Sequence, residues 1–408
     1  MIETDQASAA AEAAARASYG KLIAWLAWKW RDVCAAEDAL SEAFATALQH
    51  WPKEGVPAVP EAWLLTVAKR HLLMAARRKR LEEDPAAMIL LPDLTAPQTD
   101  VPGIPDVRLR LLFVCAHPAI DSSMHSALML QLVLGLDASQ IANAFLVSPA
   151  ALAKRLTRAK AKIRDAGIPF DEPEKAELVD RVDSVLEAIY GMYSVNGSAA
   201  SDARRSDLAE EALFLAMLAS DCLPGSAEAH GLCALLLYCE SRRFAHRDAK
   251  GRFIPLDEQI PQHWRQEMIA DAEAHLAVAA KLEQPGPYQI EAAIQAAHMH
   301  GIVAGCKPWC EISSLYEQLL QLDPTIGARI GHAVASAYAS ESPSVGLALL
   351  DAIEPSRIAA HQPWWASRAR LLAMAGRKDE STAAYERAIA LTGDVAIQNW
   401  LRRCAERP

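Results

Sequence analysis

The residues best suited to bind a charged partner lie in Leu136–Gly167 (LDASQIANAFLVSPAALAKRLTRAKAKIRDAG). Its second half carries Lys154, Arg158 and Lys162 at a spacing of four, which places these cations in one row along a helix. Three further cations lie beside that row: Arg155, Lys160 and Arg164. Such side chains neutralise phosphates and can bond the edges of bases. The segment therefore predicts a DNA-binding surface; the alternative is an ordinary surface helix with solvated lysines.

Two short helices joined by a tight turn would position these cations. Asp137 and Gln140 have the spacing of a capping box at the start of the first helix, and Ser148 followed by Pro149 favours the start of the second. An apolar stripe recurs along the second helix at Leu152, Leu156, Ala159 and Ile163. This pattern predicts a helix-turn-helix whose second helix enters the major groove of DNA.

A first helical block precedes this motif, over about Ala15–Arg80. Within it, Cys34–Gln49 is amphipathic, with Leu40, Phe44 and Leu48 on the apolar side. The polar side of the same helix carries Glu37, Asp38 and Glu42. We therefore expect an acidic surface there, for which a solvated helix face is the plainer interpretation.

A break at Trp51–Pro60 is followed by a helix that we expect to begin at Pro60. This helix carries seven polar residues that can neutralise or contact phosphate, namely Lys69, Arg70, His71, Arg77, Arg78, Lys79 and Arg80. Trp63 could stack on an exposed base, although packing between helices is the more ordinary role for a tryptophan. The proline-rich stretch Asp84–Pro105 shows no helical periodicity and is typical of an extended linker.

The composition of the 408 residues predicts an all-α protein, because alanine and leucine dominate and β-branched runs are nearly absent. No apolar run reaches the length of a membrane span, and the acidic, alanine-rich N-terminus is unlike a signal peptide. We therefore expect a cytoplasmic protein without a membrane partner. The eight cysteines form no CxxC pair, which favours reduced thiols.

One cluster of metal-ligating types stands out, with the spacing H-x-H-x5-C-x3-C: His298, His300, Cys306 and Cys310. This spacing matches no usual zinc motif, so we expect neither a metal nor another cofactor. No nucleophile–base motif, glycine-rich phosphate loop or catalytic carboxylate pair was found, and an enzyme is not expected.

The net charge of −10 is unevenly distributed. Residues 1–170 carry 19 basic and 18 acidic residues, whereas residues 171–408 carry 22 basic and 33 acidic ones. A DNA-contacting first part and an acidic, protein-facing second part is one interpretation. A merely acidic soluble domain is the other.

The C-terminal part shows weak internal repetition. LYEQLLQLDP (Leu315–Pro324) and AYERAIALTG (Ala384–Gly393) share a pattern, and their tyrosines, Tyr316 and Tyr385, lie close to two periods of about 34 residues apart. Gly376 stands where such a repeat turns. We predict degenerate helical hairpins of the tetratricopeptide type, whose stacks usually bind protein or peptide.

An acidic helix, a basic helix, a linker and a helix-turn-helix, in this order, resemble the bacterial sigma factors of the extracytoplasmic-function type. AEDALSEAFATAL, WPKEGVP and PEAWLLTVAKR are similar to region 2 of that family. DVRLRLLFVCAHPAI, GLDASQIANAFLVSPAALAKRLTRAKAKIRDAGIPF and PGPYQIEAAIQAAH look like the subfamily with a long tetratricopeptide-like extension. The resemblance implies four all-α or linking segments: region 2 at 1–84, a linker at 85–105, region 4 at 106–170 and a regulatory extension at 171–408.

The resemblance also implies partners and roles. Glu37, Asp38 and Glu42 would face the clamp helices of the polymerase β′ subunit, and region 4 would also meet the β flap. The helix of Lys69, Arg70, His71, Arg77 and Arg78 would lie on the −10 element. Lys154, Arg155, Arg158 and Lys162 would bind the −35 element, and the linker with Asp93 and Asp100 would thread toward the RNA exit path. A regulatory protein would bind the extension.

The chain departs from the family pattern at several positions. Arg70, Met74 and Ala75 replace the usual asparagine, aspartate and arginine, YSVNG (Tyr193–Gly197) replaces an FNEGY-like segment, and Gly331-His332 stands at an Asn-Arg position. A DxxGR element survives, with Asp248, Gly251 and Arg252 as candidate regulatory residues; a local turn held by a salt bridge is the alternative. A sigma-like interaction scaffold and a stand-alone DNA-binding regulator remain alternatives to a sigma factor.

Overall fold

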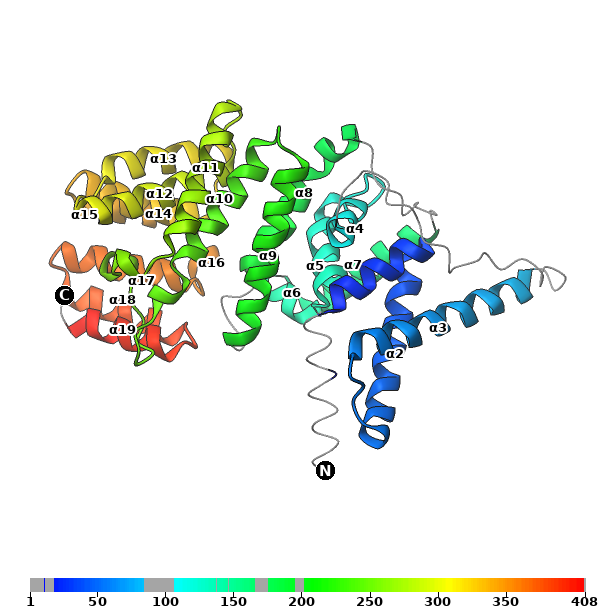
Figure 1. The fold of residues 1–408 in the computed structure, drawn as a ribbon. Helices are drawn as coiled ribbons and strands as arrows, with labels where there is room; N and C mark the ends of the chain where they lie inside the picture. Colours follow the sequence, from blue (N-terminus) through cyan, green and yellow to red (C-terminus); the bar gives the residue numbers. More distant parts are fainter. Residues whose placement is uncertain are drawn as a thin grey trace. The chain divides into compact units, whose positions relative to one another are not determined.

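The computed structural model describes residue 11 and residues 18–83, 106–136, 138–145, 147–165, 175–194 and 202–406. All regular elements in these ranges are helices, and the sole β-bridge among them joins Arg247 to Phe253. The prediction of an all-α protein is therefore confirmed (Figure 1). The predicted linker at 85–105 and the predicted cap Asp137 lie outside the described residues. The chain forms two compact units, 1–222 and 223–408.

The N-terminal unit begins with a helix over residues 18–30. It continues with α2 Val33–Glu54, α3 Pro60–Glu83, α4 Val107–Cys115, the 3-10 turn η1 Ser122–Met124, α5 His125–Leu134, α6 Ala138–Phe145, α7 Pro149–Asp165, α8 Lys175–Ser194 and α9 Asp202–Cys222. Local sequence explains where two of these helices begin. The side chain of Asp32 caps α2 by accepting from the backbone N–H of Ala35 at 2.9 Å. Pro60 begins α3, as predicted.

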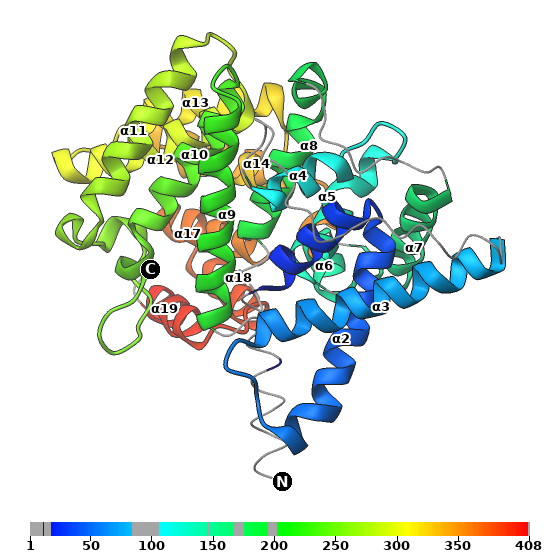
Figure 2. The same cartoon turned by 45° about the vertical axis from the view of Figure 1, so that its right-hand side comes forward.

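α2 and α3 cross and pack on each other, as Figure 2 shows. Leu40 of α2 and Leu64 of α3 are fully buried in this pair. The predicted apolar residue Leu48, however, is 49% exposed. A strict spacing of four drifts by about 40° per step around an α-helix, so Leu48 has turned about 80° away from Leu40. That part of the prediction is wrong, and the buried stripe follows Ala43, Ala47 and Trp51 instead.

α4 and α5 form the most deeply buried part of the N-terminal unit, because α8 packs on both of them and α9 packs on α4 and α8. Leu128 and Met129 of α5 are fully buried, as are Leu186 and Ile189 of α8. The boundary predicted at residue 170 stays a prediction. The packing shows that the two helices following it complete the core around α4 and α5.

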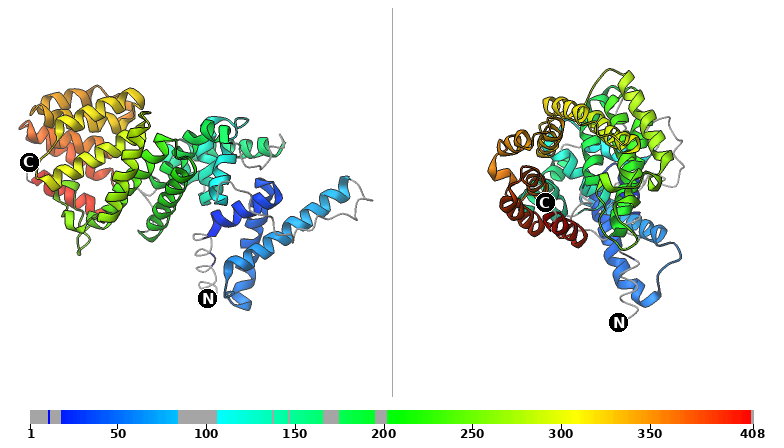
Figure 3. Two further views of the ribbon diagram at one scale, coloured as in Figure 1. Left: turned by 45° about the horizontal axis from the view of Figure 1, so that its top comes forward. Right: turned by 90° about the vertical axis from the view of Figure 1, so that its left-hand side faces the viewer.

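The C-terminal unit is a succession of helices in which each packs on its neighbours along the chain (Figure 3). Its elements are α10 Ala227–Ser241, η3 Arg243–His246, η4 Leu256–Glu258, η5 Pro261–His263, α11 Gln266–Lys281, α12 Pro287–Ala304, α13 Trp309–Leu322, α14 Ile326–Ala339, α15 Pro343–Asp351, α16 Pro355–Ile358, α17 Gln362–Met374, α18 Lys378–Ala390 and α19 Val395–Glu406. Gly376 makes the turn between α17 and α18 with a φ of +74°. Among the described helices, none is both long and apolar enough to cross a membrane.

Candidate nucleic-acid and polymerase interface

α7 is held by its apolar stripe and presents its cations on the other side. The Ser148 hydroxyl accepts from the Ala151 backbone N–H at 3.4 Å, at the predicted start of the helix. The four stripe residues Leu152, Leu156, Ala159 and Ile163 are all buried. Lys154, Arg158 and Lys162 are exposed on three successive turns. α7 therefore offers a row of solvent-accessible cations beside a buried face that fixes its orientation.

Two of the three cations beside this row are engaged within the N-terminal unit. Arg155 donates from Nη2 to the Ser123 hydroxyl at 2.6 Å, and that hydroxyl in turn donates to Asp121 at 2.7 Å. Lys160 donates from Nζ to Glu37 Oε1 at 2.6 Å. The side chains of Arg155 and Lys160 thus bind other residues of the N-terminal unit, whereas those of Lys154, Arg158 and Lys162 are exposed. The side chain of Arg164 lies outside the described residues.

The acidic surface of α2 contains three carboxylates in two different environments. Asp38 and Glu42 are exposed, whereas the side chain of Glu37 is only 19% exposed because it meets Lys160. The structure therefore brings one member of the predicted polymerase-binding set against one cation of the predicted DNA-binding helix.

The cations of α3 also differ in exposure. Arg70, Arg77 and Arg78 are exposed, whereas Lys69 and His71 are half-buried. The Lys69 ammonium lies 4.3 Å from the centre of the Trp25 ring, a cation–π contact that ties α3 to the helix over residues 18–30. The side chains of Lys79 and Arg80 lie outside the described residues.

Trp63 packs inside this part of the molecule. Its ring meets the buried Trp51 edge to face, with 5.5 Å between the ring centres. Arg70, Met74 and Ala75, where the sequence departs from the pattern that it resembles, are all exposed on α3, and Met74 is 54% exposed. These three positions on α3 are therefore accessible, while Trp63 serves the packing of α2 on α3.

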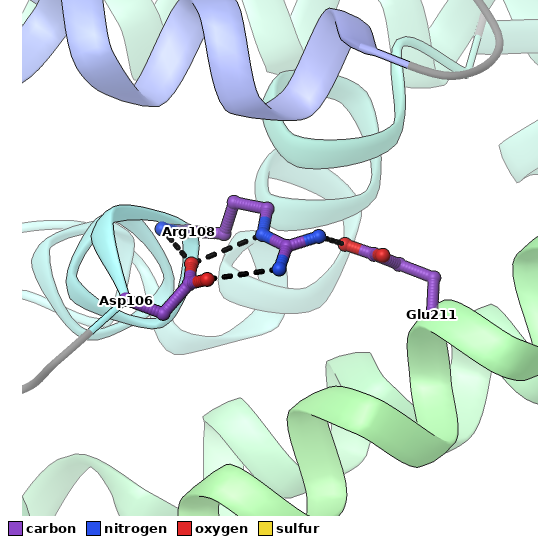
Figure 4. A network of polar contacts seen from close by, with 3 residues as sticks. All are labelled: Asp106, Arg108 and Glu211. Atoms are coloured by element: carbon purple, nitrogen blue, oxygen red, sulfur yellow. Dashed lines mark hydrogen bonds and ion pairs between the residues drawn. The ribbon is translucent and has the colours of Figure 1, made fainter.

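An ion network that joins α4 to α9 was not foreseen from the sequence (Figure 4). Arg108 of α4 is 5% exposed and donates from Nε and Nη2 to Asp106 at 3.0 and 2.8 Å, and from Nη1 to Glu211 of α9. Burial by itself would raise the pKa of Asp106, but the hydrogen bonds from Arg108 outweigh it and lower that pKa. A cation inside the apolar run VRLRLLFVC was the available signal, since a buried arginine requires acidic partners.

Two further contacts attach α8 to α4 and α5. Arg181, which is buried, donates from Nη1 to the Phe113 carbonyl at 3.2 Å. His125 and Ser184 share a hydrogen bond of 3.1 Å. With Arg108 and Glu211, these contacts fix α4 and α5 from the side of α8 and α9.

The candidate regulatory residues form a local turn in the C-terminal unit. The Asp248 carboxylate accepts from the backbone N–H groups of Lys250 and Arg252, both at 2.9 Å, and from Arg252 Nε at 2.6 Å. The backbone N–H of Arg252, together with the other donors, lowers the pKa of Asp248. Gly251 has a φ of +73°. Arg247 next to this turn donates to Asp394 at 2.6 Å, which fastens it to the start of α19.

The histidine–cysteine cluster does not converge on one point in the part of the chain that the structure describes. His298 meets the Trp309 ring edge to face, His300 bonds to Glu273 at 2.9 Å, and Cys306 and Cys310 are exposed. Among the described residues, no three histidine, cysteine or acidic side chains come together as metal ligands.

Comparison with known proteins gives two family matches. Residues 15–82 match sigma-70 region 2, and residues 181–280 match a family of unknown function, DUF6596. An uncharacterized protein of Rhizobium meliloti (strain 1021), R00370, is 36% identical over 381 residues, which cover 91% of this chain and 90% of that protein. No solved structure matches the chain. The region 2 match spans the helix over residues 18–30, α2 and nearly all of α3.

Proposed function

The chain belongs to one family with the Rhizobium meliloti protein and carries a sigma-70 region 2 domain, and from this premise we propose that it is a sigma factor of the extracytoplasmic-function type. In this proposal it binds core RNA polymerase and directs initiation at a set of promoters. The region 2 match supports a role in transcription initiation. The surfaces of α2, α3 and α7 support the more specific assignment of partners.

α7 is proposed to bind the −35 element in the major groove. From Lys154 to Lys162 the helix advances about 12 Å, which is also about the width of the groove. Arg158, in the middle of this row, is placed to bond a base edge, and one good bidentate contact discriminates by about 1–3 kcal/mol. Lys154 and Lys162 would neutralise phosphates and add affinity without sequence information.

α2 and α3 are proposed to bind polymerase and the −10 element. Asp38 and Glu42 are exposed carboxylates that suit the basic clamp helices of the β′ subunit. Arg70, Arg77 and Arg78 are exposed on α3 and suit the DNA backbone. The C-terminal unit, with the turn at Asp248 and Arg252, is proposed to regulate these activities through a protein partner.

The observation that carries this proposal is the exposed cation row on a helix whose opposite face is buried, in a chain that also has a region 2 domain. Run-off transcription with purified core polymerase tests it. Arg158→Ala combined with Lys162→Ala should abolish −35-dependent transcription, and each lost phosphate contact should lower the salt slope of DNA binding by about one. Lys281→Ala removes an exposed cation in the C-terminal unit and is the control.

Polymerase binding is tested separately from DNA binding. Asp38→Lys combined with Glu42→Lys should weaken association with core polymerase while leaving binding of isolated −35 duplex unchanged. If the unmodified protein fails to bind core polymerase at low salt, the sigma assignment is wrong. Tight, specific duplex binding without polymerase would instead favour a stand-alone DNA-binding regulator.

A further inference from the structure

Three arginines among the described residues are buried, and one of these three is bonded to uncharged groups alone. Arg108 and Arg181 form ion pairs with carboxylates. Arg242, which follows the last residue of α10, is 6% exposed. It donates from Nε to the Tyr238 carbonyl at 3.3 Å and from Nη2 to Gln295 Oε1 at 2.6 Å. Both acceptors are neutral, so neither balances the charge of the guanidinium.

Arg242 thus lacks the acidic partner that a buried cation normally has. The ion pairs of the described residues do not include it, and the nearby Glu240 pairs with Arg243 instead, with 2.6 Å between Oε2 and Nη2. The carbonyls at the C-terminal end of α10 favour a cation there, but they carry only a fraction of a unit charge. Taking an ion out of water is costly, and buried charges are therefore usually paired. An anionic ligand would supply the partner that Arg242 lacks.

Two imidazoles lie close enough to Arg242 to be affected by its charge. They belong to His246 at the end of η3 and to His298 in α12, and both of these elements pack on α10. Burial, together with the positive charge of Arg242, lowers the pKa of each histidine from 6.5 to about 4, and Arg247 adds to the effect at His246. Both rings are therefore neutral at pH 7, and each can donate one N–H to a ligand.

Two acids near this cluster form no ion pair with Arg242. Asp257 acts on His298 and opposes the fall of its pKa, but the Asp257 side chain is 64% exposed and its carboxylate lies 4.0 Å from Lys307 Nζ. Burial raises the pKa of the Cys239 thiol, and the charge of Glu291 in α12 adds to this effect. The cluster of one guanidinium and two imidazoles therefore keeps its positive charge.

We propose that Arg242, His246 and His298 form a binding site for an oxyanion, a phosphate or carboxylate group carried by a small molecule. Tyr238 and Gln295 engage Nε and Nη2 of Arg242, which leaves Nη1 to bond the ligand. Guanidinium groups suit both kinds of anion, because their N–H groups match the spacing of the anion's oxygens. The site uses no residue of α2, α3 or α7, and it is therefore independent of the proposed contacts with polymerase and promoter DNA.

Calorimetric titration of the full chain with inorganic phosphate and with acetate tests the site, in chloride buffer of constant ionic strength. One anion should bind more tightly than the other, and it identifies the ligand group. Arg242→Gln should weaken binding about ten- to hundredfold through the loss of a charge-assisted hydrogen bond. His298→Phe removes the N–H but keeps a ring against Trp309, and should weaken binding about two- to tenfold. Arg329→Gln, at an exposed position of α14, is the control and should bind normally.

Nuclear magnetic resonance of the histidine rings tests the site in the unmodified protein, without relying on the folding of a variant. The bound anion favours the charged imidazolium, so the titration midpoints of His246 and His298 should rise by about 1–3 pH units. The exposed His300 should keep its midpoint. Failure of both anions to bind, or unmoved midpoints at His246 and His298, would overturn the site. Undiminished binding by Arg242→Gln that circular dichroism shows to be folded would also overturn it.

Discussion

The helix α8 makes the sharpest prediction, because it follows the predicted end of region 4 yet fills the core around α5. Val185, Leu186 and Ile189 are fully buried, and Met192 is 1% exposed. Gly191 approaches Leu130 of α5, with 3.8 Å between a Cβ built there and a Leu130 methyl. Removing α8 would uncover α5 along this contact.

The magnitude follows from the side chains lost. Full burial of an aliphatic or methionine side chain contributes about 1.5–3 kcal/mol, so the four residues of α8 together contribute about 6–12 kcal/mol. A whole domain is stable by only about 5–15 kcal/mol. We therefore expect a fragment of residues 1–170 to lack a stable α4–α5 core. A fragment of residues 1–222, which keeps α8 and α9, should retain it.

A point substitution tests the same reasoning in the full chain. Leu186→Ala should cost about 2–5 kcal/mol of unfolding free energy, and the exposed neighbour Glu187→Ala should stay within about 0.5 kcal/mol of the unmodified protein. Urea unfolding gives the free energy, and amide hydrogen exchange of α5 locates the loss. The argument would be refuted if the amide hydrogens of α5 were protected equally in fragment 1–170 and fragment 1–222. It would also be refuted if Leu186→Ala left the free energy of unfolding unchanged.

Three further outcomes are expected from contacts within the two units. Arg108→Met should cost about 1.5–3 kcal/mol in urea unfolding, because it removes the cation that the half-buried carboxylates of Asp106 and Glu211 bond; a loss under about 0.5 kcal/mol would contradict the network. Burial, aided by the charge of Arg242, lowers the pKa of His298 from 6.5 to about 4. The unfolded chain therefore takes up the proton at a higher pH than the folded chain does. The free energy of unfolding should fall as the pH drops from about 6.5 to about 4, by at most about 1.4 kcal/mol per pH unit. Tm measured against pH follows this loss of stability. His298→Gln should reduce the fall of Tm at low pH, and His300→Gln, at an exposed position, should not. Gly346→Ala should destabilise by about 1–3 kcal/mol in thermal unfolding, since its Cβ would lie 2.6 Å from the Ala333 carbonyl. Gly327→Ala, whose Cβ would meet Thr325 Oγ1 at an ordinary contact distance of 4.0 Å, should stabilise by about 0.5–1 kcal/mol. Equal Tm values for the two variants would contradict the crowding at Gly346.

Local signals in the sequence predicted the elements of the candidate site well. The start of α7 at Pro149 and its buried stripe follow from capping chemistry and periodicity, which involve residues within a few turns of each other. The glycine turn at Gly376 was predictable for the same reason. The exposed row on α7 follows once the opposite stripe is assigned to the core.

Long-range pairings could not be predicted in this way. Lys160 has the same residue type and neighbourhood as Lys162, and only the folded chain distinguishes the cation that meets Glu37 from the one in solvent. The proline-flanked segment before α8 indicated a boundary, but nothing local shows that the apolar side of α8 matches α5. A buried Arg108 requires acidic partners, but the residues around it in the sequence do not indicate that Glu211 is one of them.

The covalent path between α3 and α4 has a consequence for the promoters that the protein could use. α3 ends at Glu83 and α4 begins at Val107, and the intervening residues span at most about 80 Å when fully extended. If region 2 and α7 bind two promoter elements as proposed, each base pair inserted between those elements adds about 3.4 Å to the distance that the chain must span. On the proposed function, the number of residues between α3 and α4 would therefore set an upper limit on the promoter spacing that the protein can use.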